Sequence, residues 1–151
     1  MKSLISILLL IPVFSSCASP SKSELDAEVK RLCAIDGGIK VYEIVVLPAL
    51  IFDKWGTIKI PMKKNAKIED DYYYQWDINY YRQGNPELSR GHFQVIRRKD
   101  EKILGESIYY GRGGGDALGP WHDSSFRCPD DADISFLKKK IFQSANKEQS
   151  K

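Results

Sequence analysis

The residues from Tyr72 to Arg82 form the strongest pattern in this sequence, because two sets of side chains alternate there with a period of two. That period is typical of a β-strand, whose successive side chains point to opposite faces of a sheet. We predict that the more aromatic set faces the core. This set comprises Tyr72, Tyr74, Trp76, Ile78 and Tyr80. The opposite face comprises Tyr73, Gln75, Asp77, Asn79 and Tyr81.

Two further strands are expected after this one, over residues 91–98 and 102–110, joined by the charged turn at 99–101. Together with 72–82 they would form an antiparallel meander. Earlier strands are expected over 39–47, which is rich in β-branched residues, and over 57–60. Residues 62–71 and 111–127 are predicted to be loops, the second of them rich in glycine.

Helices are expected at both ends of the domain. Ser21 and Glu24 have the spacing of a capping box, apolar residues follow at helical intervals, and Gly37 and Gly38 end the helix. A second helix is expected to open at Pro129-Asp130-Asp131, with an apolar face at helical spacing. That face comprises Ile134, Leu137 and Ile141. The predicted fold class is therefore α+β: an N-terminal helix, a mostly antiparallel sheet of about four to five strands and a C-terminal helix.

The composition suits one folded domain. Of the 151 residues, 42 % are hydrophobic and 28 % are charged, which excludes a disordered tail, a collagen-like repeat and a polytopic membrane protein. The predicted boundaries are a signal peptide over 1–16, a tether over 17–22, one α+β domain over 23–142 and a polar tail over 143–151.

The first sixteen residues have the features of a signal peptide. A short basic start precedes the apolar stretch Leu4 to Phe14, which is too short to span a bilayer. The sequence Phe14-Ser15-Ser16-Cys17 that follows resembles a bacterial lipoprotein signal. The resemblance implies that Cys17 receives a lipid, and Ala18 resembles the sorting pattern for the outer membrane. We therefore expect a protein of the bacterial envelope, anchored at the outer membrane by Cys17; the alternative is an ordinary secretory signal with a chance cysteine.

The other two cysteines, Cys33 and Cys128, suggest a disulfide. Disulfides persist in exported proteins, and this one would close a loop of about 95 residues, worth on the order of 4 kcal/mol. The competing interpretation is a reactive thiol. After cleavage the chain would carry 22 basic and 20 acidic residues, because Lys2 is the one charge in the signal. A net charge of +2 is too small to favour nucleic acid as a partner.

Two segments resemble a group of small, uncharacterised proteobacterial lipoproteins. The first is Cys33-Ala-Ile-Asp-Gly-Gly-Ile-Lys-Val-Tyr-Glu43, and the second is Ser124-Ser-Phe-Arg-Cys-Pro129. Each segment contains one cysteine, which favours the Cys33–Cys128 bridge. The resemblance supports the fold and implies no activity, because none is assigned to that group.

Several side chains are candidates for a binding site. Tyr73 and Tyr81, beside Gln75 and Asp77, would form an amphipathic surface of the kind found in interfaces and sugar sites, unless a helix covers them. The glycine-rich loop with Arg112 has the residue types of an anion site, although it lacks the lysine of a P-loop; the alternative is a flexible connection. His122 is a further candidate. No metal or cofactor is expected, because the two histidines lack ligand spacing.

The leading functional hypothesis is a lipid-anchored, non-enzymatic binding or structural module. Its expected partners are the membrane, through the lipid, and an envelope protein or cell-wall polymer. The first alternative is an immunity or inhibitor lipoprotein that neutralises a toxin or a lysozyme-like enzyme. The second is a hydrolase of envelope polymers that uses His122 and Asp123, although no nucleophile-elbow motif is present.

Overall fold

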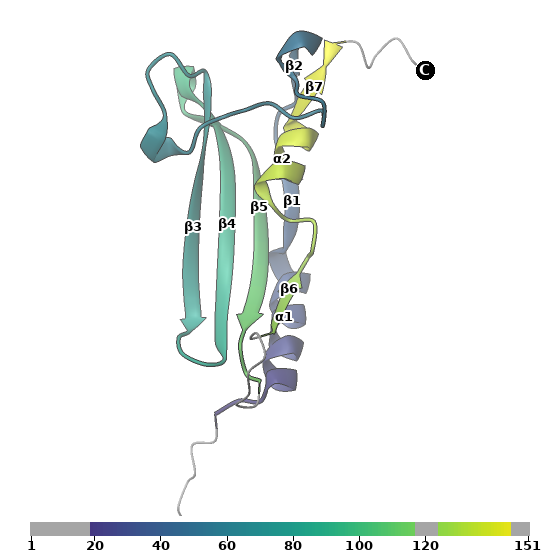
Figure 1. Ribbon diagram of the computed structural model, residues 1–151, viewed down its shortest axis with the longest axis vertical. Helices are drawn as coiled ribbons and strands as arrows, with labels where there is room; N and C mark the ends of the chain where they lie inside the picture. The colour runs from purple at the N-terminus through teal and green to yellow at the C-terminus, as the bar shows by residue number, and fades with distance from the viewer. Residues whose placement is uncertain (1–18, 117–123, 146–151) are drawn as a thin grey trace, which may run out of the picture.

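The computed structural model describes residues 19–116 and 124–145 (Figure 1). The helices are α1 (Lys22–Asp36) and α2 (Ile134–Ile141), with short 3-10 helices η1 (Ala49–Ile51), η2 (Lys63–Asn65) and η3 (Arg98–Asp100). The strands are β1 (Gly38–Val41), β2 (Val45–Leu47), β3 (Tyr72–Arg82), β4 (Glu87–Arg97), β5 (Lys102–Gly113), β6 (Ser125–Cys128) and β7 (Phe142–Ser144). The α+β class with a mostly antiparallel sheet is confirmed.

The main sheet has the strand order β1-β5-β4-β3, and β6 also pairs with β5. The long strands β3, β4 and β5 form the expected antiparallel meander. β1 pairs with residues 105–108 of β5 and β6 with residues 110–113, so these two short strands follow one another along the same edge of β5. β3 is at the opposite edge of the sheet.

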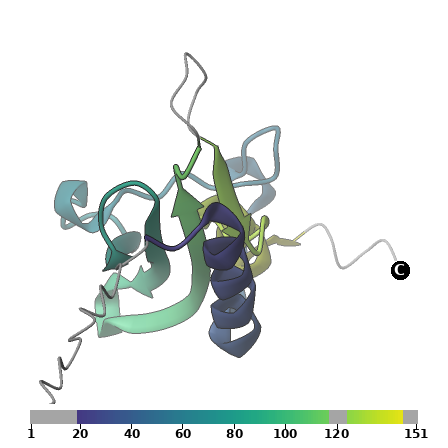
Figure 2. The same cartoon turned by 90° about the horizontal axis from the view of Figure 1, so that it is seen from below.

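Helix α1 forms where the capping pattern predicts it. The side chain of Ser21 accepts the Glu24 backbone N–H, and the Glu24 carboxylate accepts the Ser21 backbone N–H in return. Leu25 and Val29 are buried one helical turn apart, and they belong to a cluster with Leu88, Ile108 and Tyr110 of the sheet. This packing holds α1 against one face of β5 and β4. Seen from below, α1 lies beside β5, and β4 and β3 extend away from it (Figure 2).

The disulfide between Cys33 and Cys128 joins the last turn of α1 to the end of β6. The two Cα atoms are 5.8 Å apart, which is within the usual range for a disulfide. Neither sulfur atom is therefore a free thiol, which argues against the interpretation of these cysteines as a reactive thiol.

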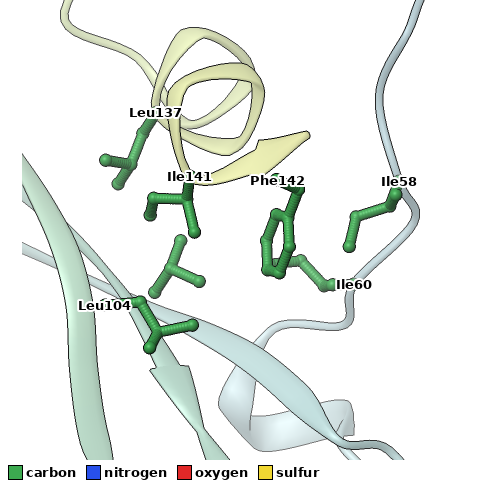
Figure 3. Close-up of a cluster of buried hydrophobic side chains, with 7 residues drawn as sticks. Ile58, Ile60, Leu104, Leu137, Ile141 and Phe142 are labelled. Carbon is green, nitrogen blue, oxygen red and sulfur yellow. The ribbon is translucent and has the colours of Figure 1, made fainter. Parts of the chain in front are cut away.

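Helix α2 packs over the other end of the sheet. Leu137 and Ile141 point toward Leu104 of β5, and Phe142 packs beside Ile60 (Figure 3). The helix begins later than the sequence suggests: Asp133 is its N-cap, and its carboxylate accepts the backbone N–H groups of two residues in the first turn. The expectation that the helix opens at 129–131 is therefore wrong.

Other boundaries differ because their pairing partners are remote in the chain. The strand expected over 39–47 is divided into β1 and β2, and β2 pairs in parallel with β7 in a separate small sheet. β7 includes residues 143 and 144, so the ordered domain continues past the predicted end at 142. Residues 57–60 are not a strand, although Ile58 and Ile60 are buried. β6 begins inside the segment 111–127 predicted to be a loop, and ends one residue after it, at Cys128.

Candidate functional site

The face of the main sheet opposite α1 is the strongest candidate for a binding site. Directly paired residues share a face, so Trp76 of β3 lies beside Phe93 of β4, while Ile78 shares a row with Gly91 and Tyr109. We call this surface the open face and define it by Trp76, Ile78, Tyr80, Phe93 and Tyr109. In Figure 1 helix α2 lies over the upper part of the sheet, beside β1 and β5, and away from β3.

The three side chains of β3 on the open face are accessible to solvent. Trp76 is 44 % exposed, Ile78 38 % and Tyr80 42 %. The prediction that this set faces the core is therefore correct for Tyr72 and Tyr74, which pack against the cluster under α2, and wrong for the other three. Isolated exposed apolar residues are common, but a contiguous exposed patch is typical of an interaction site.

The rings on the open face are stacked from strand to strand. The ring centroids of Trp76 and Phe93 are 5.9 Å apart with planes inclined by 18°, and those of Phe93 and Tyr109 are 6.0 Å apart. The guanidinium carbon of Arg127 lies 3.7 Å from the Tyr109 centroid, which is cation–π geometry. Neighbouring rings therefore hold one another in place, so binding here would cost little side-chain entropy.

Small residues lie beneath and between the aromatic rings of this face. Gly91 lies beneath Tyr109, where a Cβ would contact the ring, and Ser89, Ser107 and Gly111 share the same face. The sequence contains this signal, since these small residues are spaced at even intervals along β4 and β5. The strand register is needed to show that these small residues of β4 and β5 lie on the same face.

The opposite face, which we call the helix face, contains the residues expected to form a binding surface. Tyr73 is only 3 % exposed, and its hydroxyl donates to the Glu101 carboxylate. The Gln75 amide donates to Gln94 at 2.6 Å, while Tyr81 is 51 % exposed and stacks on Tyr110. Tyr73 is therefore not on an accessible surface, and Gln75 already has a partner within the sheet.

His92 lies on the helix face between two carboxylates. Its Nε2 is 2.9 Å from Glu106 and its Nδ1 is 3.7 Å from Asp77. Burial raises the pKa of Glu106, but hydrogen bonds from Tyr42 and His92 lower it by more, so this pKa lies below its usual value. Among the residues that the structure describes, the His92 ring bonds to no hydroxyl or thiol, and no cluster suited to a metal ion is found.

Arg112 is not available for an anion. Its side chain is buried, with the residue 3 % exposed; Nε donates to Asp26 at 2.7 Å, and Nη1 donates to the carbonyls of Gly114 and Ser124. The guanidinium thus links α1 to two places within the glycine-rich segment, Gly114 and Ser124. Anion binding by the backbone N–H groups of the glycine-rich loop stays a prediction, because residues 117–123 lie outside the described part of the chain. His122 and Asp123, like Cys17, lie outside the described residues, so the structure does not place them.

Comparison of the chain with family models, with curated proteins and with solved structures finds no match. No helix within residues 19–116 or 124–145 is long and apolar enough to span a membrane. The open face is therefore assigned on its geometry alone.

Proposed function

We propose that this protein is a non-enzymatic, lipid-anchored binding module of the bacterial envelope, and that it holds a protein partner on the open face. One observation carries the proposal: Trp76, Ile78 and Tyr80 are exposed next to one another along β3. The rings of Phe93 and Tyr109, on β4 and β5, lie beside them on the same face. Aromatic residues and arginine are enriched at the centres of protein interfaces, and Arg127 borders this surface.

The proposed anchor would hold the domain close to the membrane surface. Four residues separate Cys17 from the start of α1 at Lys22, and an extended chain of that length spans at most about 18 Å. The N-terminal end of α1 lies at the same end of the molecule as the β3–β4 turn (Figure 1). The long axis of the sheet would then rise from the bilayer, with the open face directed sideways toward other envelope proteins.

The anchor is tested by replacing its thiol. Cys17→Ser removes the sulfur that would accept the lipid, so we expect the protein to move from the membrane pellet to the soluble fraction of the envelope. Cell fractionation with immunoblotting measures this shift, and Ser16→Ala is the matched control that should leave the protein on the membrane. Retention of the Cys17→Ser variant in the pellet would contradict the anchor.

The binding face is tested with a matched pair of neighbours. Tyr80 and Tyr81 are consecutive and similarly exposed, but they lie on opposite faces of β3. A photo-crosslinking amino acid at Tyr80 should yield an adduct with an envelope protein in intact cells, and the same probe at Tyr81 should not. Mass spectrometry of the adduct identifies the partner.

A substitution then measures how much the open face contributes to the affinity for the partner. Trp76→Ala should weaken the affinity for the identified partner by about tenfold or more, which is the usual effect of removing a central aromatic residue. Titration by isothermal calorimetry provides the value, with Tyr81→Ala as the control at wild-type affinity. Adducts of equal yield from Tyr80 and Tyr81, or an unchanged affinity of Trp76→Ala, would refute the open face as the binding site.

A further inference from the structure

The outer edge of β3 is unpaired over half of its length. Near its start, Met62 forms a bridge with Tyr74, and the Tyr74 N–H donates to the Pro61 carbonyl at 3.0 Å. No described residue pairs with this edge over residues 76–80, and Figure 1 shows a neighbouring segment only beside the upper end of β3. The register becomes irregular between Tyr80 and Arg82. The free edge is therefore five residues long and centred on Ile78.

The backbone groups on this edge alternate in direction. The Tyr74 N–H points outward, away from β4, because it reaches Pro61. In a regular antiparallel strand the N–H and C=O of one residue point to the same side, and every second residue repeats that direction. Trp76, Ile78 and Tyr80 therefore present their N–H and C=O groups outward, where an added strand would meet them.

The side chains of the free edge lack the features that usually prevent strand addition. Exposed edges are commonly protected by lysine, proline or a bulge. Residues 76–80 contain no lysine and no proline, and the register irregularity of β3 comes only after them, between Tyr80 and Arg82. Their one charge is Asp77, whose carboxylate lies near His92. Tyr81, just beyond the free edge, turns toward Tyr110 of its own sheet.

We propose that this edge pairs with the same edge of a second copy of the chain, antiparallel, about a two-fold axis at Ile78. Such a contact is isologous, so each residue meets its symmetry partner. Ile78 would face Ile78 of the second copy, and Trp76 would face Tyr80, each pair exchanging two backbone hydrogen bonds. The pattern is self-complementary, because the aromatic residues meet one another on the open face.

Charge favours this register over the one centred on Asp77. Centred on Ile78, the pairing places Asp77 opposite Asn79 of the second copy, and the amide can donate to the carboxylate. A shift that centres the pairing on Asp77 would place two carboxylates directly opposite each other, which is destabilising. The dimer joins two main sheets into one and makes the two open faces continuous, but it requires only the strand edge and not the envelope partner proposed above.

The experiment places a cysteine on the proposed axis of the full-length protein in its membrane. In Ile78→Cys the two thiols would lie on a hydrogen-bonded pair whose Cα atoms are about 5.5 Å apart, within reach of a disulfide. Mild oxidation should convert most of this variant to a linked dimer on a non-reducing gel. Tyr81→Cys is the matched control: its two copies would be six strand positions apart, about 20 Å, and should stay unlinked.

A second pair of variants separates the edge from the open face. Ile78→Pro removes an outward N–H that the sheet itself does not use, so sedimentation should change from dimer to monomer with circular dichroism unchanged. Phe93 is on β4, one strand away from the free edge. The Phe93→Ala variant should therefore remain dimeric while losing affinity for the envelope partner. A wild-type protein that is monomeric up to its solubility limit would overturn the dimer. Linkage of the Ile78→Cys variant to a different protein, or equal linkage of both cysteine variants, would overturn it as well.

Discussion

Replacing both Cys33 and Cys128 by alanine is expected to lower the free energy of unfolding by about 4 kcal/mol, because the bond closes a long loop in the unfolded chain. The two cysteines are 95 residues apart in the sequence, so the bond removes much of the unfolded chain's freedom. Small domains are stable by only about 5–15 kcal/mol, so this is a large share of the total. Urea unfolding followed by tryptophan fluorescence measures the change.

Loss of the disulfide should loosen α1 and β6 and leave α2 unaffected. The disulfide joins the last turn of α1 to β6, while α2 packs in a separate cluster at the other end of the sheet. Hydrogen exchange should therefore increase most in α1 and β6. Reductant should destabilise the wild type by the same amount and leave the double variant unchanged. If both thiols of the untreated protein can be alkylated, the bond is absent and the prediction is refuted.

Arg112→Met is expected to cost about 3 kcal/mol of stability, because it leaves buried hydrogen-bond acceptors without a donor. The guanidinium bonds to the Asp26 carboxylate and to the carbonyls of Gly114 and Ser124. Methionine keeps the apolar volume of the side chain, so the loss measures the polar contacts rather than a cavity. The comparison requires urea unfolding of both proteins under the same conditions.

The matched control is Arg31→Met on α1, the helix to which Arg112 of β5 bonds through Asp26. Arg31 also pairs with a carboxylate, that of Glu28, at 2.7 Å, but both side chains are exposed to solvent. An exposed pair of this kind contributes at most about 1 kcal/mol, so the control should be nearly as stable as the wild type. Equal effects of the two substitutions would show that the burial of Arg112 has no energetic consequence.

The side-chain links and the disulfide act on opposite ends of α1. Arg112 binds Asp26 in its second turn, and Lys22 at its start pairs with Asp116 at 2.7 Å, while the disulfide holds its last turn. Helix α1 is thus tied to the sheet at both ends, next to the proposed membrane anchor.

The predictions from sequence are most accurate where the relevant contacts are local. The capping box at Ser21, the alternation over 72–82 and the meander of β3, β4 and β5 are all confirmed, because each depends on residues close together in the chain. They are less accurate for β2, β6 and α2. β2 pairs with β7 almost a hundred residues later, and such a partner leaves no periodic pattern of its own.

The two faces of β3 show this difference between local and long-range contacts most clearly. Period-two alternation divides the strand into two sets of side chains, and hydrophobicity favours burial of the set with Trp76 and Ile78, yet both of these side chains are exposed. The outcome depends on the positions of α1 and α2: α1 covers the face with Ile108 and Tyr110, and α2 reaches only the upper end of the other. Local spacing specifies strands and caps through short-range sterics and hydrogen bonds. Exposure of Trp76, Ile78 and Tyr80 is instead a property of long-range packing, which exists only once the chain has folded.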